Sequence, residues 1–297
     1  MRILLTGCDG QVGWEICRKA AHYGFDVVPT DIGNLDITDI DAIRSLHSDQ
    51  PSDIIINSAA YTAVDKAEDD EELAHQVNAV GAENLAIVAR ENDLPMLHIS
   101  TDYIFNGDAT TAYNDDSNPD PQGVYGKTKL AGEVLVQKAN QKYVTLRTSW
   151  VFGIEGQNFV KTMLRLGKEK EEISVVADQF GSPTFAGHIA TALLELTRQY
   201  QSDTNLPWGS YNFCDAGTTT WYMFTVKIMQ LAVDQGILST SPVVRPIRTE
   251  DYPTAATRPA YAVMDCSRFA DTFPQIGISS WESGLREMIS TLAKESN

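Results

Sequence analysis

The sequence predicts an α/β fold in which a parallel sheet is covered by helices on both faces. In the first half of the chain, short apolar segments alternate with amphipathic segments of helical period, which is the pattern of a buried, doubly wound parallel sheet. A glycine-rich loop joins the first apolar segment to the first helix. After about residue 152 the alternation loosens, which indicates a smaller, discontinuous α/β lobe added to the sheet.

The elements of the first half follow from these patterns in order. Strands are expected at 2–6, 25–29, 53–57, 94–100 and 143–148, where apolar residues run together. Helices are expected at about 14–21, 38–47, 66–91 and 124–139. Thr38 or Asp36 is expected to cap the second helix. The third helix carries Leu73, Val77 and Val80 near helical period.

The first strand and the first helix are joined by Thr6-Gly7-Cys8-Asp9-Gly10-Gln11-Val12-Gly13. Glycines there permit a tight turn, and the helix N-terminus offers free amides and a partial positive charge to a pyrophosphate. The alternative is a plain turn that uses glycine for its positive φ. Because a second strand follows in order, the pattern favours a Rossmann-type dinucleotide site.

Asp31 ends the second predicted strand. A carboxylate there can accept hydrogen bonds from the adenosine ribose and would repel a 2′-phosphate. The alternative is a simple turn residue. The expected cofactor is therefore NADH or NADPH, with NADH favoured by Asp31.

These motifs divide the chain into two parts. Residues 1–152 are expected to form the dinucleotide-binding domain, and residues 153–297 mainly a substrate-binding lobe. In the second half, helices are expected at 159–166, 186–196, 221–232 and 281–292, and strands at 173–176, 211–213 and 243–247. Segments near 185–215 are expected to return to the first domain.

Composition excludes several classes of partner. A net charge of −17 over 297 residues opposes binding to nucleic acid or anionic lipid. The four cysteines form no C-x-x-C pair and the five histidines are scattered, so no metal site is predicted. No stretch is long and apolar enough for a signal peptide or a membrane span. We expect a cytoplasmic protein, as a monomer or homodimer.

Tyr125 and Lys129 are four residues apart at the start of the predicted helix 124–139, so they share one face of it. Of the eleven tyrosines, only Tyr125 has a lysine four residues later. An ammonium beside a phenol favours the phenolate, so Lys129 is expected to lower the Tyr125 pKa and make it a proton donor near neutral pH. The alternative is a chance pair on a solvated helix face. Thr101 follows the fourth strand, at the edge where ligands bind.

This group resembles the extended short-chain dehydrogenase/reductase superfamily, in which a Tyr-x-x-x-Lys pair and a Ser or Thr polarise a carbonyl during hydride transfer. Longer motifs resemble the dTDP-4-dehydrorhamnose reductase family, which makes the last reduction in dTDP-L-rhamnose synthesis. They are GQVGWE from residue 10, NSAAYTAVDKAE from 57, STDYIF from 100, YGKTKLAGE from 125, RTSWVFG from 147, ADQFGSPT from 177 and TRP from 257. The motifs run in order through residues 2 to about 260.

The resemblance implies a role for each site residue. Cofactor contacts are expected from Gly7, Gly10, Gln11, Val12, Gly13, Asp31, Asp36, Ile37, Ala60, Tyr61, Thr62, Tyr125 and Lys129. The catalytic residues are expected to be Thr101, Tyr125 and Lys129. Tyr125 would protonate the C4 oxygen, Lys129 would hold the nicotinamide ribose, and Thr101 would hydrogen-bond the sugar carbonyl. Asp102 would lie beside Thr101 as a substrate contact.

Two further substrate contacts are expected. Trp150 would pack on the sugar ring, since an indole offers a flat apolar face; the alternative is a core tryptophan. Arg258 is expected to meet the substrate diphosphate, because basic residues are few in the second half and Pro259 fixes its local backbone. The alternative for Arg258 is a surface ion pair.

The chain departs from the family pattern at a few positions. Ser58 and Tyr61 stand where alanine and histidine are common, and Pro259 is followed by Ala260 rather than asparagine. Some members dimerise around Mg²⁺ held by acidic residues, including a glutamate matching Glu15. Mg²⁺ is therefore possible, but the segment 191–200 holds only Glu195 and no acidic pair, so this metal site is not predicted.

The expected activity is reduction of the C4 keto group of dTDP-4-dehydro-6-deoxy-L-mannose to dTDP-L-rhamnose. One alternative is a reductase or epimerase acting on another nucleotide-linked sugar. The other is a regulatory homologue that has lost catalysis, which the presence of Thr101, Tyr125 and Lys129 together argues against.

Overall fold

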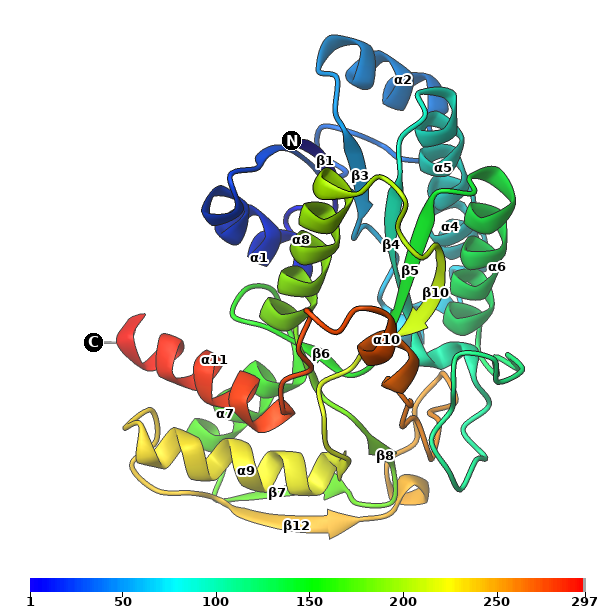
Figure 1. Ribbon diagram of the computed structural model, residues 1–297. Helices are drawn as coiled ribbons and strands as arrows, with labels where there is room; N and C mark the ends of the chain where they lie inside the picture. Colours follow the sequence, from blue (N-terminus) through cyan, green and yellow to red (C-terminus); the bar gives the residue numbers. More distant parts are fainter. Residues whose placement is uncertain (296–297) are drawn as a thin grey trace.

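The computed structural model describes residues 1–295 and confirms the Rossmann-type α/β fold (Figure 1). Six strands form the central sheet in the order β10-β5-β4-β3-β1-β2. They are β1 (Arg2–Thr6), β2 (Asp26–Thr30), β3 (Ile54–Asn57), β4 (Met96–Thr101), β5 (Tyr143–Thr148) and β10 (Gly209–Asn212). All neighbouring pairs are parallel, so the carboxyl ends of all six strands lie at one edge.

Helices cover both faces of this sheet. They are α1 (Gln11–Ala20), α2 (Ile40–Asp49), α3 (Val64–Ala67), α4 (Glu71–His75), α5 (Ala82–Glu91), α6 (Val124–Ala139) and α8 (Ala186–Ser202). Ile3 and Leu5 of β1 pack in the core with α1 and α8, and Leu4 between them packs in the core with α5 and α6. Both faces of β1 are therefore apolar, which explains its unbroken hydrophobic sequence.

Two expectations about helices were wrong. The single helix expected at 66–91 is divided into α3, α4, a π-helical segment (Gln76–Gly81) and α5. The π-helical segment places Asn78 where its side chain accepts from the Tyr61 amide at 2.8 Å and donates to Thr128. The cap of α2 is Asp39, whose carboxylate accepts from two backbone amides of the first turn.

The segment 186–212 adds one helix and one strand to the sheet. α8 packs beside α1 on one face, and β10 pairs with β5 at the edge of the sheet. Leu193 and Leu196 of α8 lie in the same core as β1. This segment thus belongs to the sheet, although the strands β6 to β9, which precede it in the sequence, lie outside the sheet.

The lobe lies beneath the sheet in Figure 1 and has a core of its own. Its helices are α7 (Phe159–Glu169), α9 (Trp221–Asp234) and α11 (Trp281–Glu295). The helix α10 (Ser267–Thr272) instead packs against β10, with Phe269 in the core of the sheet. Its strands are β6 (Val151–Phe152), β7 (Glu172–Val176), β8 (Phe180–Gly181), β9 (Thr184–Phe185), β11 (Thr219–Thr220) and β12 (Val243–Ile247). Across residues 1–295, no helix combines the length and the apolar character needed to cross a membrane.

Candidate active site

A cavity of about 940 Å³ runs along the carboxyl edge of the sheet, with Trp221 of the lobe on its wall. Most of the residues singled out from the sequence line it. They are Gly7, Gly10, Gln11, Val12, Asp31, Asp36, Ile37, Ala60, Tyr61, Thr62, Thr101, Asp102, Tyr125, Lys129 and Trp150. Two of the expected contacts, Gly13 and Arg258, are not part of the lining.

Gly13, in the first turn of α1, packs against the backbone of Gly7 in the glycine loop. A Cβ atom at this position would lie 2.0 Å from the Gly7 carbonyl oxygen, so only glycine lets the first turn of α1 approach the loop so closely. Gly13 therefore supports the loop by allowing this close approach.

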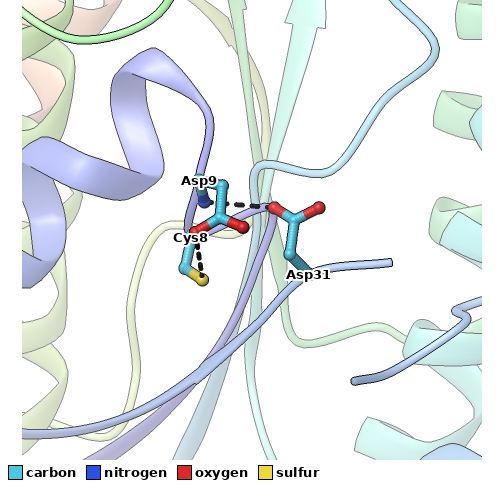
Figure 2. A group of neighbouring side chains, drawn as sticks. All are labelled: Cys8, Asp9 and Asp31. Atoms are coloured by element: carbon cyan, nitrogen blue, oxygen red, sulfur yellow. Dashed lines mark hydrogen bonds between the residues drawn. The ribbon is translucent and has the colours of Figure 1, made fainter. Parts of the chain in front are cut away.

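Two carboxylates, those of Asp9 and Asp31, are part of the cavity lining. Figure 2 shows them next to each other, with Cys8 beside them. The Asp31 carboxylate accepts from the Asp9 amide at 3.1 Å and from the Ile32 amide at 2.8 Å. Asp9 brings a second carboxylate to the same place and was not foreseen from the sequence. Ligand atoms of Cys8, Asp9 and Asp31 lie within 4.8 Å of one another. Burial raises the pKa of the Cys8 thiol to about 12, so this thiol is protonated at neutral pH and does not favour a metal.

Tyr125 and Lys129 reach the cavity because α6 packs tightly against the end of β4. A Cβ on Gly126 would lie 2.2 Å from the Tyr103 carbonyl oxygen, so glycine is required for this approach. Lys129 is buried, and its Nζ donates to the Ile99 carbonyl oxygen of β4 at 2.7 Å. These contacts fix the first turns of α6 beside the strand end that carries Thr101.

A chain of side chains links Tyr125 to a buried carboxyl group. The Thr101 hydroxyl donates to Asp102 Oδ1 at 2.9 Å, and the Thr101 side chain also interacts with the Tyr125 phenol, whose pKa it lowers. Asp102 begins the short 3₁₀ helix Asp102–Ile104 and is 3% exposed. Its second oxygen, Oδ2, is buried and has no hydrogen-bond partner among the described residues.

Burial dominates the ionisation of this group. It raises the pKa of Tyr125 well above its usual range, raises the pKa of Asp102 to about 7 and lowers the pKa of Lys129 to about 8. The expected lowering of the Tyr125 pKa by Lys129 is wrong for the protein without ligands. The physical reason is that desolvation of the phenolate outweighs the favourable interaction with Thr101.

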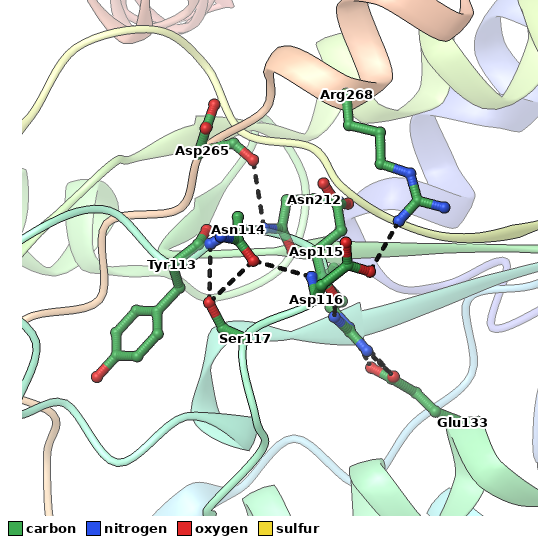
Figure 3. A network of polar contacts seen from close by, with 10 residues as sticks. Tyr113, Asn114, Asp115, Asp116, Ser117, Glu133, Asn212, Asp265 and Arg268 are labelled. Carbon is green, nitrogen blue, oxygen red and sulfur yellow. Dashed lines mark hydrogen bonds and ion pairs between the residues drawn. The ribbon is translucent and has the colours of Figure 1, made fainter.

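A buried ion pair holds the far side of α6 on the sheet. Arg147 of β5 and Glu133 of α6 are 9% and 5% exposed, and their closest N–O distance is 2.9 Å. Arg147 also donates to the Asp115 carbonyl oxygen. Figure 3 shows how the loop of Asp115 is attached on its other side to Asn212 of β10 and Arg268 of α10. Glu133 also raises the Lys129 pKa, so this pair opposes the effect of burial on Lys129.

Two tryptophans form the wall of the cavity on the lobe side. The rings of Trp150 and Trp221 stack with centroids 3.5 Å apart and planes 9° from parallel. Trp150 has a φ of 47°, which is uncommon for a residue with a side chain. Trp221 is fixed further by its indole N–H, which donates to Gln179. One face of Trp150 is thus covered by Trp221, and the wall is a pair of rings rather than one.

Arg258 lies behind the cavity lining. Its Nη2 donates to Asp65 at 2.6 Å, and its guanidinium stands 5.9 Å from the Tyr103 ring centroid. Its Nη1 is buried without a hydrogen-bond partner among the described residues. Tyr103 lines the cavity, so Arg258 is one side chain away from it.

Glu15 lies next to two cationic side chains, Arg18 and Lys19. It is fully buried, and its Oε2 accepts from Arg18 at 2.6 Å and lies 3.8 Å from Lys19 Nζ. Lys19 donates to the Thr191 hydroxyl as well. A carboxylate opposed by two cationic side chains does not fit a Mg²⁺ site, which prefers several oxygen ligands.

The chain is similar along nearly its whole length to one family of known proteins. The sequence profile of the RmlD substrate binding domain matches residues 1–294. The dTDP-4-dehydrorhamnose reductase of Aggregatibacter actinomycetemcomitans is 39% identical over 288 residues, which cover 97% of this chain and 98% of that protein. The chain belongs to the dTDP-4-dehydrorhamnose reductase family.

Solved structures of family members support this assignment. The dTDP-4-dehydrorhamnose reductase of Clostridium acetobutylicum is 38% identical, with a TM-score of 0.91 over 98% of this chain and 99% of the other. The enzyme of Bacillus anthracis, solved in complex with NADP, is 37% identical, with a TM-score of 0.89 over 97% and 98%. The family relationship therefore extends along the whole described chain.

Sequence reasoning missed several residues of this reductase cavity. Asp9 lies within the glycine loop, where nothing in the sequence distinguishes it from its neighbours. Tyr103 lies within the motif STDYIF, without a signal of its own. Trp221 gave no signal beyond its place at the start of a predicted helix. It meets Trp150 only because the lobe folds back onto the sheet edge.

Proposed function

We propose that this chain transfers hydride from NADH or NADPH to C4 of dTDP-4-dehydro-6-deoxy-L-mannose and so forms dTDP-L-rhamnose. The relatives of the same length are named dTDP-4-dehydrorhamnose reductase, which supports this substrate. The observation that carries the proposal is the meeting of Thr101, Tyr125 and Lys129 at the end of β4, in the cavity that also contains the glycine loop.

Several chain segments fit a nicotinamide dinucleotide. The amides at the start of α1 would hold the pyrophosphate, because a helix N-terminus attracts anions. Asp31 is oriented by two backbone amides and keeps lone pairs for the adenosine ribose. Asp9 and Asp31 together disfavour a 2′-phosphate, so we expect NADH to be used more readily than NADPH, although a relative was solved with NADP. When bound, the nicotinamide supplies the hydride.

Tyr125 is the proposed proton donor to the C4 oxygen. Hydride arriving at C4 places negative charge on that oxygen, and a donor aimed at it contributes typically about 3 kcal/mol in such sites. Thr101 interacts with the Tyr125 phenol and lowers its pKa. Lys129 is anchored to Ile99 and would present its charge to the nicotinamide ribose.

The remaining contacts are proposed for the sugar nucleotide. The exposed edge of the Trp150–Trp221 pair offers an apolar surface to a deoxysugar. Arg258 has an unpaired buried Nη1 next to Tyr103, which suits a diphosphate that enters from this side. Its pairing with Asp65 would hold the guanidinium in place before the substrate arrives.

The test is a comparison of ketone substrates with the purified protein. NADH oxidation is measured with dTDP-4-dehydrorhamnose and with other dTDP- and GDP-linked 4-keto sugars. We expect the first substrate to have the highest kcat/KM. Equal rates across the panel would contradict the specific substrate, and no oxidation with any member would contradict a reductase.

A further inference from the structure

Asp102 lies where a second proton could be stored for the reaction. It is almost completely buried, yet it lines the cavity directly behind Thr101. One carboxyl oxygen is bonded to Thr101 and the other has no partner among the described residues. A buried carboxylate that lacks partners is costly, so the neutral acid is favoured there.

Among residues 1–295, no cationic side chain contributes to the pKa shift of this carboxyl group. The titratable groups that face it are Tyr103 on the same 3₁₀ helix, Tyr125 of α6 and Cys214 beyond β10. None of these three is a cation, and Lys129 is directed to Ile99. As a result the Asp102 pKa lies at about 7, which allows the group to gain and lose a proton near neutral pH.

We propose that Asp102 supplies the proton that replaces the one Tyr125 gives to the substrate, with the Thr101 hydroxyl as the link between them. This inference rests on the proposed function. Tyr125 alone is a poor acid here, because its phenolate would be left buried in the cavity. If the proton is replaced as it leaves, no buried phenolate accumulates.

Three proton transfers occur together with the hydride transfer. The Tyr125 O–H bond breaks as the C4 O–H bond forms, while the hydride forms the new C–H bond. The Thr101 O–H bond breaks as the Tyr125 O–H bond is restored. The Asp102 O–H bond breaks as the Thr101 O–H bond is restored, which leaves an Asp102 carboxylate that takes up a proton from the solvent of the cavity after product release.

The same geometry sets the direction of the Thr101 hydroxyl. When Asp102 is ionised, Thr101 donates to it, as in this structure. When Asp102 is neutral, its own hydrogen can be given to the Thr101 oxygen, and the Thr101 hydrogen is free to turn towards Tyr125. Turnover should therefore need neutral Asp102 and should decline as the pH rises through about 7.

The first test is Asp102→Asn. Asparagine can donate a hydrogen bond to Thr101 but cannot release a proton, so it keeps the orientation and removes the transfer. We expect kcat to fall at least tenfold, KM and NADH affinity to stay within about twofold, and the break in kcat near pH 7 to disappear. An unchanged kcat with the same break would overturn the proposal. Asp108→Asn, an exposed carboxylate nearby, is the matched control and should behave as the unaltered protein.

A second variant covers the case in which Asp102→Asn does not fold. Thr101→Val interrupts the link and leaves Asp102 in place, so it should also lose the break near pH 7. If both single variants fold, the double variant should be no slower than the slower of them, because they remove the same pathway. Retention of the break in Thr101→Val would overturn the relay.

A third measurement is independent of the substrate. In the protein saturated with NAD⁺, infrared difference spectra between pH 5 and pH 9 should show a carboxylic acid band that disappears near pH 7 and is absent from Asp102→Asn. An ionised Asp102 throughout this range would overturn the relay even if the dTDP sugar is turned over. Failure of the unaltered protein to reduce any ketone, with this band present, would instead contradict the proposed function.

Discussion

Lys129 Nζ donates to the carbonyl oxygen of Ile99 at 2.7 Å, and this bond ties the catalytic helix α6 to the end of β4. Tyr125 lies one helical turn before Lys129, so the same bond fixes the height of the phenol above the sheet. The ammonium is thus bonded to the backbone of β4, and burial is the largest cause of the raised Tyr125 pKa.

Tyr125→Phe should lower kcat by about 10²–10⁴-fold, because it removes the proposed proton donor. The ring is retained, so the NADH dissociation constant should change little. Steady-state kinetics and fluorescence titration with NADH measure both effects. Tyr252→Phe, in which the altered side chain is 61% exposed, is the control, and equal activity of the two variants would remove Tyr125 as the acid.

Asp31→Ala should shift the preference towards NADPH. The substitution removes one of the two neighbouring carboxylates of Asp9 and Asp31 and with it the repulsion of a 2′-phosphate. We expect the ratio of kcat/KM for NADPH to that for NADH to rise about tenfold. Asp26→Ala is the control, since Asp26 is exposed at the start of β2, the strand that Asp31 follows; this variant should keep the original ratio. An unchanged ratio in Asp31→Ala would show that Asp31 does not contact the adenosine ribose.

Trp221→Ala should weaken sugar-nucleotide binding without affecting the dinucleotide. The substitution removes the ring that stacks on Trp150, so the Trp150 side chain is no longer held in one position, although its backbone has a positive φ. An aromatic pair is worth about 1 kcal/mol, so KM for the sugar nucleotide should rise about fivefold. Trp221→Phe retains a ring and should recover most of the loss. If the alanine variant keeps the original KM, the stack does not belong to the substrate site.

Glu133→Gln should destabilise the protein by about 3 kcal/mol, because it leaves Arg147 buried without its charge partner. The same change lowers the Lys129 pKa further below about 8, since Glu133 raises it. Activity at pH 8 should therefore fall more than activity at pH 7. Urea unfolding and pH–rate profiles measure the two effects. Glu72→Gln, on the exposed side of α4, is the control that should show neither.

Asp102 should make the free energy of unfolding depend on pH. Its pKa is about 7 in the folded protein against 3.8 as the ordinary value, so the folded state binds a proton that the unfolded state releases. The stability that comes from this proton is present below about pH 4 and is lost progressively as the pH rises to about 7. The loss amounts to at most about 4 kcal/mol. Urea unfolding of Asp102→Asn should lack this decline, and parallel pH curves for the two proteins would contradict it.

Much of the fold was predictable because it depends on local patterns. The helix Val124–Ala139 and the strands Arg2–Thr6, Tyr143–Thr148 and Val243–Ile247 have the bounds expected from apolar runs and helical period. The division of the helix expected at 66–91 was not predictable, because the π-helical turn is stabilised by hydrogen bonds of Asn78 to Tyr61 and Thr128. These partners lie outside the segment itself.

The sequence by itself determined the glycine loop, the alternation of strands and helices in the first half and the shared helix face of Tyr125 and Lys129. Strand period, helix period and the conformational freedom of glycine are local properties of the chain. The tertiary structure alone decided that Trp221 stacks on Trp150, that Arg258 pairs with Asp65, and that Asp102 stands buried behind Thr101. Each depends on surfaces distant in the sequence. The ionisation of Tyr125 was decided in the same way, because desolvation is set by everything that surrounds the phenol and not by the residue one turn away.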